Sequence, residues 1–115
     1  MFKFGKQFMQ VLSGKKKILS SNPQMIGMIG VEVSMFESWY AERHNKALPD
    51  NELLTVIYNI LDREQFIFSD EEAKAILSTV VVGFPQEQIK QMRIQNNFDS
   101  KVKVFCQSIN CQHLL

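Results

Sequence analysis

The sequence predicts an all-α fold: a single-domain bundle of five to six helices with a long central helix around residues 31–46. Apolar residues recur at spacings of three and four through most of the 115 residues, which is the period of an amphipathic helix. Proline or a capping residue stands before several of these stretches, where helices begin. No stretch alternates apolar and polar residues over a length typical of sheet strands.

The distribution of charge divides the chain into a basic, Phe/Lys-rich head at residues 1–17 and a helical bundle domain at residues 18–115. All five charges of the head are lysines, namely Lys3, Lys6, Lys15, Lys16 and Lys17. The remainder carries eight basic and twelve acidic side chains, so the head has a net charge of +5 and the rest of the chain a net charge of −4. This asymmetry favours an anionic partner or surface, or contact between the head and the acidic body.

Residues 2–12 are predicted to form a short amphipathic helix. Its apolar face consists of Phe4, Phe8, Val11 and Leu12. Three interpretations follow: the face packs on the bundle with the lysines in solvent, it inserts into an anionic membrane surface, or the lysines contact nucleic-acid phosphates. We favour packing, because nine phenylalanines already indicate a Phe-rich core.

The longest helix is expected from Pro23 to about Lys46, with Asn22 as its N-cap. Its apolar stripe is Met25, Ile29, Val33, Phe36 and Tyr40, widened by a second row of Met28, Met35 and Trp39. Gly27 and Gly30 indicate either close approach of a neighbouring helix or a helix that starts only after Gly30. A helix apolar on much of its circumference belongs in the middle of a bundle, so Phe36 and Trp39 are expected to be buried.

Later helix starts are marked by proline or by capping residues. Ser69 and Glu72 form a capping box, in which each side chain bonds the other residue's backbone N–H. One helix is expected to begin at Pro49, with a buried face from Leu53 to Leu61, and the next to begin after Ser69. A further helix is expected from Pro85 to about Asn96, and the last from Asp99 or Ser100 to His113. The nearest approaches to strands are 65–68 and 102–105, and both are short.

The motifs of the common enzyme classes are missing from the sequence. His44 and His113 lack the spacing of zinc-protease or di-iron sites, and no phosphate-binding loop or nucleophile motif occurs. Cys106, Cys111 and His113 do not have the spacing of a standard zinc site. We therefore predict a non-enzymatic protein with no catalytic residue, metal or cofactor.

The two cysteines are five residues apart. On a continuous helix their Cα atoms would lie about 7–9 Å apart, so a disulfide would require the helix to break. The longest apolar runs are also too short to span a membrane. These features favour a reduced, cytoplasmic protein.

Residues 76–96 resemble a helix-turn-helix only in general pattern, with Gly83 in the turn and Ile89 on the inner side of the second helix. The residues that would face nucleic acid are Gln86, Gln88, Lys90, Gln91 and Arg93. Glu87 and the acidic residues 70–72 oppose this hypothesis, because they would repel phosphate. An ordinary helical hairpin has the same pattern.

The preferred hypothesis is a small intracellular interaction or regulatory protein that binds a protein partner through a helical surface. The alternatives are nucleic-acid binding through residues 76–96 and peripheral membrane association through the basic head. Homo-oligomer formation is also compatible with the sequence.

Overall fold

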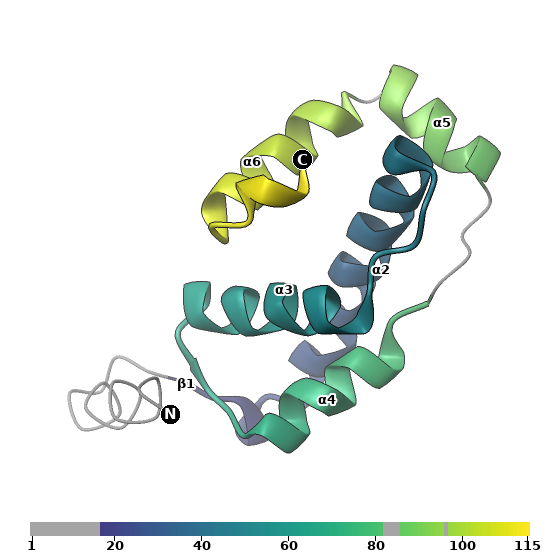
Figure 1. The fold of residues 1–115 in the computed structure, drawn as a ribbon. Helices are drawn as coiled ribbons and strands as arrows, with labels where there is room; N and C mark the ends of the chain where they lie inside the picture. The colour runs from purple at the N-terminus through teal and green to yellow at the C-terminus, as the bar shows by residue number, and fades with distance from the viewer. Residues whose placement is uncertain (1–16, 82–85, 96) are drawn as a thin grey trace.

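The computed structural model describes residues 17–81, 86–95 and 97–115, without the side chains of Gln86 and residues 92–95. The elements are β1 (Lys17–Ile18), η1 (Leu19–Ser21), α2 (Gln24–His44), α3 (Asp50–Arg63), β2 (Phe66–Ile67), α4 (Asp70–Thr79), α5 (Gln86–Gln95), α6 (Phe98–Ser108) and η2 (Gln112–Leu114). More than half of the chain is α-helical, which confirms the predicted all-α class (Figure 1). The helix expected at residues 2–12 lies outside the described residues.

Helix α2 is the centre of the bundle, as predicted. It packs against α3, α4 and α5, and Figure 1 shows α4 near its N-terminal half and α5 near its C-terminal half. Phe36 and Trp39 are 2% and 3% exposed, so both belong to the core. The helix begins at Gln24, so a start after Gly30 is wrong. Asn22 does not cap it, because its side-chain amide donates to the Ile18 carbonyl instead.

The two glycines of α2 differ in their surroundings. A Cβ atom added at Gly30 would collide with Thr79 Oγ1 of α4, whereas one at Gly27 would have no neighbour within 4 Å. Beside this contact, Ser34 Oγ donates to the Gly30 carbonyl (2.7 Å) and accepts from the Val81 N–H (2.8 Å). Gly30 therefore permits the close approach of α2 and α4 that its position suggested.

The predicted capping box at the start of α4 is present. Ser69 Oγ accepts from the Glu72 N–H (3.1 Å), and Glu72 Oε1 accepts from the Ser69 N–H (2.8 Å). These bonds satisfy two backbone donors that the first turn of a helix leaves without a partner.

A two-residue parallel pair joins β1 to β2, with Lys17 opposite Phe66 and Ile18 opposite Ile67. The segment 65–68 was one of two with a strand-like pattern, but its partner came from a stretch that carries no strand signal. The Lys17 N–H donates to the Gln65 carbonyl at 3.0 Å. This pairing fixes the point at which the head leaves the bundle, directly beside the end of α3.

Helix α6 ends between the two cysteines, which corrects the prediction of a helix running to His113. Asn110 adopts a left-handed conformation (φ 58°) and its N–H bonds the Gln107 carbonyl, while the Cys111 N–H bonds the Cys106 carbonyl at 2.8 Å. These two bonds define a Schellman motif, in which Cys106 and Cys111 are the pair that usually makes the closing side-chain contact.

The Schellman motif also changes the expected separation of the cysteines. With a 2.8 Å hydrogen bond joining their backbones, standard bond lengths limit the Cα–Cα distance to at most about 6.7 Å. Both thiols are nevertheless free and buried. Burial, with a contribution from Cys111, raises the pKa of Cys106 to about 11, and burial also raises the pKa of Cys111. Such protonated thiols react poorly, which favours a packing role.

Candidate functional site

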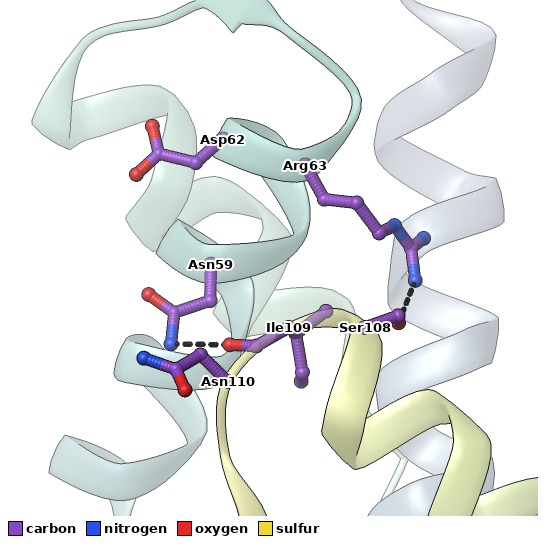
Figure 2. Close-up of a pocket in the computed structure, with 6 residues that line it drawn as sticks. All are labelled: Asn59, Asp62, Arg63, Ser108, Ile109 and Asn110. Carbon is purple, nitrogen blue, oxygen red and sulfur yellow. Dashed lines mark hydrogen bonds between the residues drawn. The ribbon is translucent and has the colours of Figure 1, made fainter.

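A polar hollow of about 340 Å³ lies where the end of α3 meets the end of α6 (Figure 2). Its lining residues are Asn59, Asp62, Arg63, Ser108, Ile109 and Asn110. Asn59 Nδ2 donates to the Ile109 carbonyl (2.9 Å), and Arg63 Nη1 donates to Ser108 Oγ (3.1 Å). Figure 2 shows Asp62 and Arg63 pointing to opposite sides. The hydrogen bonds hold the turn after α6 against α3, so this hollow contributes mainly to assembly of the fold.

A second, apolar hollow of about 320 Å³ separates α2 from α6. It is lined by Glu32, Met35, Phe36, Phe98, Lys101, Val102 and Phe105. Long side chains bridge the two helices here. The rings of Phe36 and Phe105 are 5.4 Å apart, and Trp39 Nε1 donates to Asp99 Oδ1 at 2.8 Å. Because rings and long side chains meet across this gap, the two helices stand apart and leave a groove.

A third hollow of about 170 Å³ extends this groove toward the start of α2. Its lining residues are Met25, Met28, Ile29, Glu32, Ile60, Arg63 and Glu64. Glu32 belongs to both hollows, so they form one surface, which we call the α2/α6 groove. Of the row Met28, Met35 and Trp39, predicted to widen the apolar face of α2, only Trp39 is buried in the core. Met28 is 61% exposed and Met35 is half-buried, and both line this surface.

Four charged side chains line the α2/α6 groove. Lys101 comes from α6, and the other three meet at the α3 end of the groove. Arg63 pairs with Glu32 (3.5 Å) and with Glu64 (3.2 Å), and its guanidinium carbon lies 5.9 Å from the centre of the Phe105 ring. Burial raises the pKa of Glu32, an effect that Arg63 partly offsets. Two carboxylates share one guanidinium here, so this end of the groove favours a cationic group on a ligand.

The lysines predicted as partner or anion contacts fall mostly outside the described residues, namely Lys3, Lys6, Lys15 and Lys16. Lys17 is described. It is exposed, and its ammonium group lies 4.7 Å from the centre of the Phe66 ring. A cation–π contact therefore holds the side chain of Lys17 on β2.

The nucleic-acid hypothesis required α4 and α5 to pack as a hairpin. Gln88, Lys90 and Gln91 are exposed and Ile89 is buried, as predicted, while the side chains of Gln86 and Arg93 lie outside the description. The arrangement differs, however, because α5 packs on α2 and α6, and α4 lies beside the other half of α2 (Figure 1). A helix-turn-helix needs its two helices packed together. The described parts of α4 and α5 do not show that close packing, and nucleic-acid binding through residues 76–96 stays a prediction.

One buried acidic group was not identified as buried from the sequence. Glu37 is 1% exposed, and neither of its carboxylate oxygens has a hydrogen-bond partner of good geometry. Burial raises its pKa, and the nearby Leu48 backbone lowers it in part. Its position, four residues after Val33 and three before Tyr40, is the signal that places it on the buried stripe.

The cysteines and His113 do not gather into one site. His113 is exposed and its Nε2 lies 3.2 Å from Glu52 Oε2. Among the described residues, no cluster of three or more histidine, cysteine, aspartate or glutamate side chains has the arrangement needed to hold a metal ion.

Comparisons with protein-family models, with curated proteins and with solved structures found no match to this chain. None of the helices in the described part is both long and apolar enough to cross a membrane.

Proposed function

We propose that this protein is a non-enzymatic interaction protein that binds an amphipathic helix of a partner protein in the α2/α6 groove. The main support for this proposal is the groove, which is an apolar surface lined by α2 and α6 that ends at the Glu32–Arg63–Glu64 cluster. A partner of the matching chemistry carries bulky apolar residues at helical spacing and a basic residue near one end.

The side chains that line the groove suit this mode of binding. Met25, Met28 and Met35 come from one face of α2, and methionine adapts its shape to different apolar surfaces. From α6, the lining residues Phe98, Val102 and Phe105 recur at spacings of four and three. The groove therefore presents an adaptable wall opposite a more rigid aromatic wall, which supports docking of one apolar helix face.

The proposal is tested by selecting helical peptides from a displayed library against the full chain and measuring their dissociation constants. We expect the selected peptides to share apolar residues at spacings of three and four, together with lysine or arginine. Met28→Asp should weaken their binding by at least about tenfold, because it places a carboxylate in the groove beside Glu32 and Glu64.

A matched control is available on the same helix. Val31 is 64% exposed, close to the exposure of Met28, but it does not line the groove. Val31→Asp should therefore change the dissociation constants by less than about twofold, which is under 0.5 kcal/mol. Selected peptides that bind Met28→Asp as tightly as the unchanged chain would contradict the proposal, and so would failure to select any peptide.

A further inference from the structure

The head leaves the described structure at one end of the α2/α6 groove. Lys17 is bonded through its backbone to Gln65, the residue after Glu64, and Glu64 lines the groove. The pairing of β1 with β2 and the contact of the Lys17 ammonium with the Phe66 ring both hold this point in place. Residues 1–16 therefore join the described structure beside the Glu32–Arg63–Glu64 end of the groove.

The length of the preceding segment matches the groove. Residues 13–16 can bridge up to about 14 Å when extended. The helix predicted at residues 2–12 would be about 16 Å long, and the part of α2 from Met25 to Phe36, which lines the groove, has nearly the same length. The segment can therefore reach the groove and cover it without displacing β1.

The chemistry of the segment also complements the groove. Phe4, Phe8 and Leu12 are bulky apolar residues at spacings of four, which the methionine and phenylalanine walls can accept. Residues 1–16 carry four lysines and no acid. They start beside a cluster in which Glu32 and Glu64 share Arg63, on a body whose charges sum to −4.

We infer that residues 2–12 of this chain occupy the α2/α6 groove of the same molecule and compete there with the outside partner. This inference rests on the proposed function, because it assigns an internal ligand and a mode of regulation to the same site. A partner helix must displace the segment before it binds, so its apparent affinity is reduced by the fraction of molecules in which the groove is covered.

The test places a photo-crosslinking benzoylphenylalanine at position 8 of the full chain and identifies the adducts by mass spectrometry. The aromatic replacement preserves the bulk of Phe8, so the measurement does not depend on a destabilising change. We expect adducts within one molecule, mainly on Met28 and Met35. The matched control places the same group at Gln10, which is on the opposite face of the predicted helix and should give few groove adducts.

Several outcomes would overturn the inference. They are adducts of position 8 outside the groove, adducts between two copies of the chain, and equal groove labelling from positions 8 and 10. No groove adduct combined with binding of the chain to phosphatidylserine vesicles or duplex DNA would also overturn it, because the segment would then serve an outside surface.

A second measurement separates this inference from the proposed function. Phe8→Asp should release the segment and tighten binding of the selected helical peptides by at least about fivefold. If the peptides bind but Phe8→Asp leaves their affinity unchanged, residues 2–12 do not occupy the groove, and the groove remains the proposed partner site. If no peptide binds to either chain, the proposed function itself is wrong.

Discussion

The two sides of α2 are built differently. On the side facing α4, Gly30 meets Thr79 so closely that a single added carbon would collide, and Ser34 bonds the backbone of Val81. On the side facing α6, rings and thioethers meet across a groove. Small residues let two backbones approach and close the surface, whereas long residues hold helices apart and leave a surface on which another apolar segment can dock.

The largest change in the free energy of unfolding is expected at Phe36, which belongs to both the core and the groove. Phe36→Ala should lower the free energy of unfolding by about 3–5 kcal/mol, because the ring is buried, stacks with Trp39 and packs at a tilt against Phe105. Chemical denaturation measures this change. A loss below about 1 kcal/mol would mean that the α6 side collapses easily onto α2, and the contrast between the two sides would disappear.

The two glycines of α2 provide a second comparison between its closely packed α4 side and a position with open space. Gly27→Ala should raise the free energy of unfolding by about 0.5–1 kcal/mol, because alanine favours a helix and nothing lies near the new methyl group. Gly30→Ala should lower it by about 1–2 kcal/mol, since overpacking against Thr79 exceeds the gain in helix propensity. Equal effects at the two positions in denaturation experiments would show that the α4 side is not closely packed.

A smaller change is expected at Glu37, whose ionisation makes the free energy of unfolding depend on pH. Burial raises the folded-state pKa above 4.5, so the unfolded state releases this proton at a lower pH than the folded state does. The contribution of Glu37 to the free energy of unfolding is therefore fully present below about pH 4.5 and is lost as the pH rises through the folded-state pKa. Glu37→Gln should remove this contribution, so the free energy of unfolding of the variant should fall less, or rise more, between pH 4.5 and 7 than that of the unchanged chain, as measured by denaturation across that range. An unchanged slope would show that the carboxylate is hydrated.

Sequence patterns predicted the features that depend on neighbours along the chain. The capping box at Ser69 needs only a residue three positions away, and the burial of Phe36 follows from helical periodicity. The groove depends on the distance between α2 and α6, and helical periodicity does not give that distance. Periodicity therefore placed Met28 on the apolar face of α2 without showing that it lines an open groove. The Schellman motif was missed because its signal is one residue, Asn110, in a conformation that asparagine adopts more readily than most residues.

The most direct test of the groove is nuclear magnetic resonance of methyl groups in the full-length Phe8→Asp variant, titrated with a synthetic peptide of residues 1–12. We expect the methyl resonances of Met25, Met28 and Met35 to shift as the peptide binds, while those of Thr79 and Val81 on the closed side of α2 stay unchanged. Shifts at Thr79 and Val81 without shifts at the three methionines, or no shift at any of the five residues, would contradict the assignment of the α2/α6 groove as the docking site.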